Sequence, residues 1–233
     1  MITLIGVGHV FAISDKVREI IRYSRPEVVC LELDPQRYQS LLSKERSGSA
    51  PLQYKLLAYF QTRMADKFGT EAGDEMLAAA SAAGEVGAKI ALIDMDAPQV
   101  FAGLWRSMSM REKLGLMAGA FTGLFLSKER VVEEIEKYEG HEEEYLTLLG
   151  EGYPSIKRVL IDDRNKFMAD RLKDISAKHG NVFAVIGDGH IPGIMEQLRP
   201  LEVKAIRLRD VRTGEQGALT KAEFSATYFY DQH

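Results

Sequence analysis

The stretch ITLIGVGHVFAISDKVREIIRYSRPEVVCLEL, residues 2–33, indicates the fold class. Two short apolar runs, Ile2–Ile5 and Val28–Leu33, enclose a segment whose apolar residues recur at helical spacing. Strands that are covered on both faces of a parallel sheet are continuously apolar in this way. Ser14 is expected to cap the helix, and Pro26 to end it before the second run. The stretch therefore predicts two parallel strands joined by a helix.

Three more runs have the same character, namely Lys89–Ile93, Val182–Ile186 and Val203–Leu208. The segments between the runs have helical patterns over residues 51–84, 99–149 and 154–178. Strands that alternate with helices are typical of α/β proteins. We therefore predict one α/β domain over residues 1–233, with a mostly parallel central sheet of about five strands flanked by helices. A largely helical insertion is expected at about residues 99–150.

The composition is that of a globular protein, with 45% hydrophobic and 27% charged residues. The net charge of −4 does not suggest a basic face for nucleic acid. A single cysteine excludes an intrachain disulfide and gives no sign of an oxidising compartment. The start of the chain lacks the features of a signal peptide. We therefore expect a cytoplasmic protein.

The most apolar segment covers residues 114–126, a run of 13. A transmembrane helix needs about 20 residues, so no integral membrane segment is predicted. The run is expected to be a buried helix of a soluble fold, the alternative being a groove or a contact with a membrane surface. The insertion to which it belongs either packs inside the subunit or forms a homodimer.

Two apolar runs are each followed by Gly-x-Gly-His, once ending in His9 and once in His190. Ligands of open α/β sheets bind beyond the carboxyl ends of the strands. These two histidines can therefore converge on one crevice, although each could instead only hydrogen-bond a loop carbonyl. The other histidines, His141, His179 and His233, are expected at the surface or at the chain end.

Glu32 closes an otherwise apolar run, where burying a carboxylate is costly unless it is paired, protonated or bound to a metal. It could form an ion pair with Arg37 or Arg164, or act as a metal ligand or general base. Asp94 occupies the matching place after the third run and is a candidate further ligand. Asp96 could cap the helix that follows it.

Two imidazoles and a carboxylate are a standard ligand set for Zn²⁺ or another divalent transition metal. Such a metal activates a bound water for the hydrolysis of an amide or ester. Without a metal, histidine and glutamate could act as general bases. Neither a Gly-x-Ser-x-Gly elbow nor a phosphate-binding loop is present in the sequence.

Arg164 shares one side of its predicted helix with Phe167 and Met168. An arginine on an inward side requires a carboxylate or a bound anion. The alternative is a salt bridge on the helix surface with Asp163 or Asp170.

The chain resembles the TraB/PrgY family of pheromone-shutdown proteins, which are related to GumN and to the Tiki metalloproteases. The matching stretches are residues 5–42, then LIDMDAP at 92–98, LIDDRNKFMADRL at 160–172 and VFAVIGDGHIPGI at 182–194. The resemblance implies an α/β fold like those of erythromycin esterase, ChaN and Tiki. It also implies a metal-dependent peptidase, a hydrolase that acts on peptides or proteins.

In this family two Gly-x-x-His motifs and a glutamate form the site, which map to His9, Glu32 and His190. Manganese or cobalt is the expected metal, with zinc as an alternative, and Arg37 and Arg164 are expected to line the substrate pocket. The chain departs from the family at Met95, which stands where arginine is common, and at Asn165, which replaces an aspartate. The C-terminal membrane helices of many archaeal relatives are not matched.

The sequence therefore predicts a metal-dependent hydrolase of the Tiki type, in which His9, Glu32 and His190 form the catalytic site and hold the metal. Two alternatives remain open. One is a protein that binds peptides without cleaving them, and the other is an esterase that needs no metal.

Overall fold

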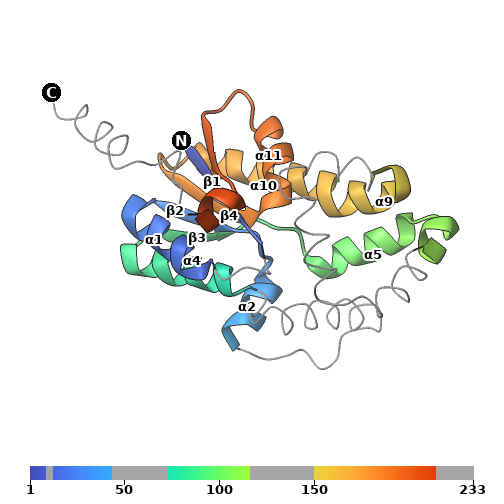
Figure 1. The fold of residues 1–233 in the computed structure, drawn as a ribbon, viewed down its shortest axis with the longest axis horizontal. Helices are drawn as coiled ribbons and strands as arrows, with labels where there is room; N and C mark the ends of the chain where they lie inside the picture. Colours follow the sequence, from blue (N-terminus) through green and yellow to red (C-terminus); the bar gives the residue numbers. More distant parts are fainter. Residues whose placement is uncertain (9–12, 44–72, 116–149, 214–233) are drawn as a thin grey trace.

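The structure is a computed structural model that describes residues 1–8, 13–43, 73–115 and 150–213. Its centre is a five-stranded parallel sheet in the order β3-β2-β4-β1-β5 (Figure 1). The strands are β1 (Ile2–Val7), β2 (Val28–Leu31), β3 (Lys89–Leu92), β4 (Val182–Gly187) and β5 (Val203–Ile206). The predicted α/β class and the parallel sheet are confirmed.

The strand order brings distant parts of the chain together. β4 lies between β1 and β2 and pairs with both, so the first two strands along the chain are not neighbours. Val7 at the end of β1 is in register with Gly187 at the end of β4. Both Gly-x-Gly-His stretches therefore begin at adjacent strand ends, on the same edge of the sheet.

Helices cover the sheet on two sides (Figure 1). One side carries α1 and α4, and the other carries α10 and α11. The helices are α1 (Ser14–Ser24), α2 (Pro35–Ser43), α4 (Asp74–Val86), α5 (Ala97–Ser107), α9 (Pro154–Lys157), α10 (Asp163–Ser176), α11 (Ile191–Gln197) and α12 (Leu208–Thr213). A π-helical turn, η1 (Arg158–Asp162), joins α9 to α10, and a 3₁₀ turn, η2 (Asp188–His190), joins β4 to α11.

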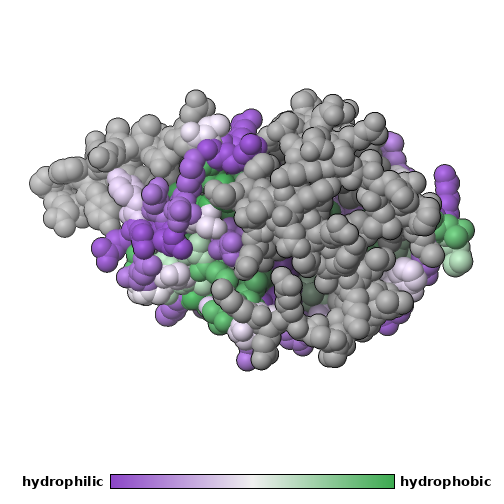
Figure 2. Space-filling model, turned by 60° about the horizontal axis from the view of Figure 1, so that its bottom comes forward, coloured by the Kyte–Doolittle hydropathy of each residue, from purple (hydrophilic) through white to green (hydrophobic). Residues whose placement is uncertain are grey.

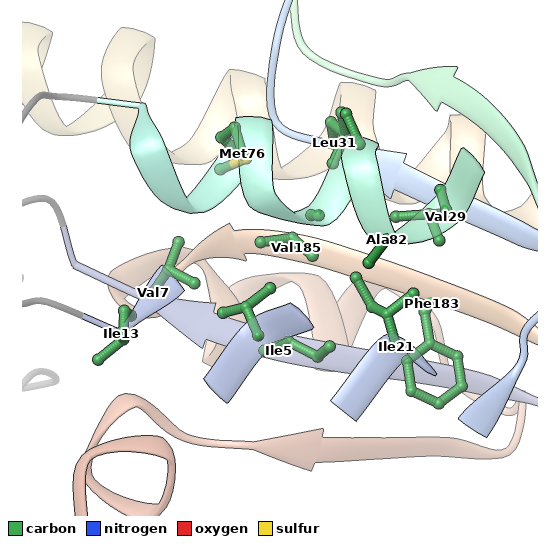
Figure 3. Packing of buried hydrophobic residues seen from close by; sticks show 14 of the residues in the cluster. Ile5, Val7, Ile13, Ile21, Val29, Leu31, Met76, Ala82, Phe183 and Val185 are labelled. Atoms are coloured by element: carbon green, nitrogen blue, oxygen red, sulfur yellow. The ribbon is translucent and has the colours of Figure 1, made fainter. Parts of the chain in front are cut away.

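Alternation along the strands divides the core into two layers. Side chains that face α1 and α4 include Ile5, Val7, Val29, Leu31, Phe183 and Val185, packed against Ile21, Met76 and Ala82 (Figure 3). The residues between them face α10 and α11 and include Ile2, Leu4, Val28, Cys30, Val182, Ala184 and Ile186. Residue 32 continues this second set, which directs Glu32 toward the α10 side.

The structure corrects the predicted start of the first helix. Ser14 is the first residue of α1, and Ile13 stands at the N-cap without a side-chain cap, so the prediction that Ser14 caps the helix is wrong. The physical reason is that Ile13 is buried in the core, which fixes the chain there by packing. At the other end Arg25 adopts φ 44°, and Pro26 follows.

The long helix predicted over residues 154–178 is present as α9, η1 and α10. Of the predicted helical insertion, α5 lies within the described residues, whereas residues 116–149 lie outside them. Residues 51–72 of the earlier helical segment also lie outside, and α4 covers its later part.

On the face seen in Figure 2, hydrophilic and hydrophobic residues are intermixed over the described surface. No helix among the described residues has both the length and the apolar character needed to span a bilayer.

Candidate functional site

A buried carboxylate stands at the centre of the candidate site. Glu32 follows β2 and is 9% exposed. Its Oε2 accepts a hydrogen bond of 2.5 Å from the backbone N–H of Gly187, at the end of the neighbouring strand β4. Its Oε1 accepts from Nη2 of Arg164 and lies 3.4 Å from Nε2 of His190. One carboxylate thus links β2, β4 and α10.

Arg164, in the first turn of α10, connects this glutamate to Asp94. Its Nε and Nη2 donate to the two oxygens of Asp94 at 2.9 and 2.8 Å, in the parallel geometry that arginine favours. Its Nη1 donates to the carbonyl of Leu160, within the π-helical turn, at 3.2 Å. The alternative of a surface salt bridge to Asp163 or Asp170 is wrong because Arg164 points inward.

His190 lies in η2, directly after β4, and is 6% exposed. Its Nδ1 is 2.7 Å from Oδ1 of Asn165, and its Nε2 is 3.2 Å from Nη1 of Arg164. A guanidinium can only donate, so Nε2 must accept, and Nδ1 therefore carries the proton. The contacts on both sides of the ring agree on this tautomer.

The charges in the site follow from these contacts. Burial lowers the pKa of His190 below its ordinary value, and the positive charge of Arg164 lowers it further. The carboxylates of Glu32 and Asp94 raise this pKa and only partly oppose the two effects. Burial alone would raise the pKa of Glu32, but His190, Arg164 and the N–H of Gly187 bring it below its ordinary value. Near neutral pH the site therefore holds an ionised carboxylate beside a neutral imidazole.

Arg37 extends the cluster toward solvent. Its Nη1 donates to Oδ2 of Asp94 at 3.1 Å, and its side chain is 40% exposed. Asp34 fixes the start of α2, because its Oδ1 accepts from the backbone N–H groups of Gln36 and Arg37 at 2.9 Å. The other oxygen of Asp34 accepts from the N–H of Ala97 at 3.3 Å, at the start of α5. A single buried aspartate thus ties together the two helix starts that flank Asp94.

The predicted role of Asp96 as a helix cap is confirmed. Its side chain accepts a hydrogen bond of 3.1 Å from the N–H of Gln99 in the first turn of α5.

Asp188 fixes the turn that carries His190. Its Oδ1 accepts from Nε of Arg207 at 3.0 Å and from the N–H of Leu208 at 2.8 Å, beyond the end of β5. A Cβ on Gly6 would lie 2.1 Å from this oxygen. Glycine at position 6 thus allows the Asp188 carboxylate to cross β1 and join β4 to the segment after β5.

Asn165 and Asp188 were not predicted as site residues. The sequence marked Asn165 only as a departure from a family pattern, and Asp188 only as a spacer within its motif. Gly193 was also overlooked, and a Cβ there would lie 2.2 Å from Nδ2 of Asn165. The sequence places Asn165 directly after Arg164 and Gly193 one helical turn after His190. These positions were the only indication that the two residues could belong to the site.

The structure brings together five of the six predicted site residues, namely Glu32, Arg37, Asp94, Arg164 and His190. His9, the sixth, lies outside the described residues. The ion pair between Glu32 and Arg164, one of the alternatives considered for Glu32, is present. Within the described ranges, no three or more His, Cys, Asp or Glu side chains are grouped so that they could hold a metal ion.

Known proteins are similar to this chain in structure or in sequence. A solved structure of heme-binding ChaN from Campylobacter jejuni is similar over 88% of this chain and 80% of that chain, with 12% identity and a TM-score of 0.40. The uncharacterized protein MJ1365 of Methanocaldococcus jannaschii is 33% identical over 218 residues, which cover 86% of this chain and 54% of the relative. The chain thus spans about half the length of this curated relative.

A family model matches residues 1–209, which include every strand in the described part of the chain and all the residues of the candidate site. The chain therefore belongs to the TraB/PrgY/gumN family.

Proposed function

We propose that this protein is a hydrolase that cleaves peptides and uses a divalent metal ion held by His190 and Glu32. The observation that carries the proposal is the pairing of Nε2 of His190 with Oε1 of Glu32, 3.4 Å apart in a buried site. The imidazole nitrogen has its lone pair on that side, and the carboxylate is ionised. Both atoms are therefore in the protonation state that a metal ligand needs.

The described residues fit such an ion in two further respects. Two ligand atoms at about 2.1 Å from one ion lie about 3.4 Å apart in tetrahedral coordination, as the two atoms here do. Histidine ligands usually donate their other ring N–H to an oxygen acceptor, and Asn165 supplies one. The proposal assigns a further ligand position to His9, because β1 and β4 end side by side.

A bound divalent ion would lower the pKa of a water molecule and polarise the substrate carbonyl. If Glu32 is not needed as a ligand, its ionised carboxylate can accept the proton of that water as a general base. Arg164 would stabilise the negative charge that develops on the carbonyl oxygen. Arg37, whose side chain is 40% exposed, would bind a substrate carboxylate.

Asp94 is assigned a different role from the one expected of a ligand. Both of its oxygens accept from Arg164, and one also accepts from Arg37. The proposal therefore makes Asp94 the residue that orients the two arginines. Manganese, cobalt and zinc all accept imidazole and carboxylate ligands.

The test is the cleavage of a peptide library, read by mass spectrometry, after a chelated preparation is supplied with Mn²⁺, Co²⁺ or Zn²⁺. The unaltered chain is expected to give products with at least one of the metals. His190→Ala should give none, whereas His179→Ala should match the unaltered chain because His179 pairs with Glu27 away from the site. Equal cleavage by the unaltered chain and His190→Ala would refute the proposal.

A second candidate is a protein that binds peptides without cleaving them. It is favoured by the guanidinium groups of Arg164 and Arg37, which together balance the charges of Glu32 and Asp94. This candidate predicts peptide binding that survives chelation, with no product after long incubation. Ester cleavage that resists a chelator would instead favour an esterase with His190 as the general base.

A further inference from the structure

Both atoms assigned to the metal are already in contact with one guanidinium. Nη2 of Arg164 donates to Oε1 of Glu32, and Nη1 donates to Nε2 of His190 at 3.2 Å. Arg164 therefore lies where a shared ion would have to approach.

The charges of the cluster are balanced as it stands. The carboxylates of Glu32 and Asp94 face the guanidinium groups of Arg164 and Arg37, and Nε2 of His190 accepts from Arg164 and so carries no proton. A divalent ion added between Glu32 and His190 would place two positive charges beside the guanidinium of Arg164. In a buried site such repulsion is only weakly screened.

Arg164 has a second anchor that does not involve the two ligand atoms. Its Nε donates to Oδ1 of Asp94 at 2.9 Å, so the guanidinium can keep this contact while it turns away from Glu32 and His190. Nη2, the nitrogen that donates to Glu32, also donates to Oδ2 of Asp94 at 2.8 Å, so this second bond has to be given up or exchanged when the guanidinium turns. Asp94 is 7% exposed and offers a fixed acceptor for the displaced cation.

We infer that Arg164 is a built-in competitor of the metal, a side-chain cation that holds Glu32 and His190 together until a divalent ion displaces it. The inference rests on the proposed function, because it uses the same two ligands. It assigns Arg164 a positioning role beyond binding substrate: the arginine sets how tightly the ion is bound. Removing its charge should strengthen metal binding, the opposite of what is expected for a residue that supports the site.

The test is a Co²⁺ titration of the metal-free full chain, followed by visible absorption and checked by equilibrium dialysis. Arg164→Met, which removes the charge and keeps an unbranched side chain, is expected to bind Co²⁺ about tenfold tighter or more, which corresponds to about 1.4 kcal/mol. Arg164→Lys retains the charge and should stay closer to the unaltered chain. Equal or weaker binding by a folded Arg164→Met would overturn the inference.

Two further measurements locate the effect. In Arg164→Ala, free guanidinium at non-denaturing concentration should refill the vacated space and weaken Co²⁺ binding, which it should not do in Arg164→Lys. The double variant Arg164→Met with His190→Ala should lose the added affinity. Failure of guanidinium to compete, or retention of the added affinity in the double variant, would count against the inference.

A crystal structure of the unaltered chain with Co²⁺ covers the case in which the variants do not fold. The guanidinium of Arg164 is expected on Asp94 and away from Glu32 and His190. An ion bound to both ligands with Arg164 unmoved would overturn the inference and leave the proposed metal site intact. Absence of Co²⁺ binding in every folded protein would refute the metal site and the inference together.

Discussion

Oδ1 of Asn165 lies 2.7 Å from Nδ1 of His190 and holds the ring with an unprotonated Nε2, which lies 3.4 Å from Oε1 of Glu32. Asn165 is itself 5% exposed and packed over Gly193. The orientation of the candidate ligand is therefore set by a neighbour on α10.

Replacing Asn165 by leucine removes the acceptor and keeps a similar volume. The ring of His190 then loses its fixed tautomer, and Co²⁺ affinity is expected to fall by roughly 10–100-fold. Asn165→Asp retains an acceptor and should bind at least as well as the unaltered chain. Co²⁺ titration with visible absorption measures both, and unchanged affinity in Asn165→Leu would contradict this role for Asn165.

Gly6→Ala is expected to destabilise the fold. The added Cβ would lie 2.1 Å from Oδ1 of Asp188, which Arg207 and Leu208 hold in place. Urea unfolding should show a loss of roughly 1–3 kcal/mol, the usual range for an overpacked site.

The matched control is Gly84→Ala in α4, where nothing lies within 4 Å of the added atom. That change should stabilise the protein by roughly 0.5–1 kcal/mol, since alanine is the better helix former. Combining Gly6→Ala with Asp188→Ala should remove much of the clash penalty. A penalty for Gly6→Ala that is independent of Asp188 would show that the carboxylate is not its cause.

Glu112 links the chain on the two sides of residues 116–149. Its carboxylate accepts from the N–H groups of Ser109 at 2.7 Å and Ser155 at 2.8 Å. These two bonds are the main reason why the pKa of Glu112 falls from 4.5 to about 2. Hydrogen bonds from the hydroxyls of Ser109 and Ser155 lower this pKa further. Since the folded-state pKa is the lower one, the stabilisation is complete above about pH 4.5 and is lost as the pH falls toward 2.

Glu112→Gln should therefore melt at a lower temperature than the unaltered chain at pH 7, and the difference should narrow as the pH is lowered from 4.5 toward 2. Thermal unfolding followed by circular dichroism across this range measures the gap. A gap of constant size at every pH would mean that the charge of Glu112 contributes nothing.

Asp34→Ala removes the acceptor at the starts of both α2 and α5. We expect a loss of roughly 1–3 kcal/mol, because buried N–H groups are left unpaired in addition to the lost caps. Asp96→Ala removes a cap only from α5 and should cost about 1 kcal/mol. Chemical denaturation compares the two variants, and equal losses would argue against a double role for Asp34.

The five strands could be predicted from their short apolar runs, although only β1, β2 and β4 are buried along their length and the edge strands β3 and β5 are partly exposed. Their order could not, since the pairing of β4 with both β1 and β2 depends on contacts between residues more than 150 positions apart. The start of α1 was misplaced by one residue because packing of Ile13 outweighed the capping preference of Ser14.

In the site, Glu32 could be recognised because an ionisable side chain ended an apolar run. Arg164 was identified from its helix face, but its partner Asp94 lies 70 residues away. Asn165 and Asp188 were missed because each acts through contacts that only the folded backbone creates. The role of Gly6, which is to allow the close approach of Asp188, depends on the pairing of β1 with β4 and could not be predicted from the sequence.

The most direct test of the central claim is the number of Co²⁺ ions bound per chain, measured by equilibrium dialysis on the unaltered protein, His190→Ala and Glu32→Gln. The account predicts one ion for the unaltered chain and none at this site for either variant, with circular dichroism showing that all three are folded. Equal Co²⁺ uptake by the three proteins would contradict it.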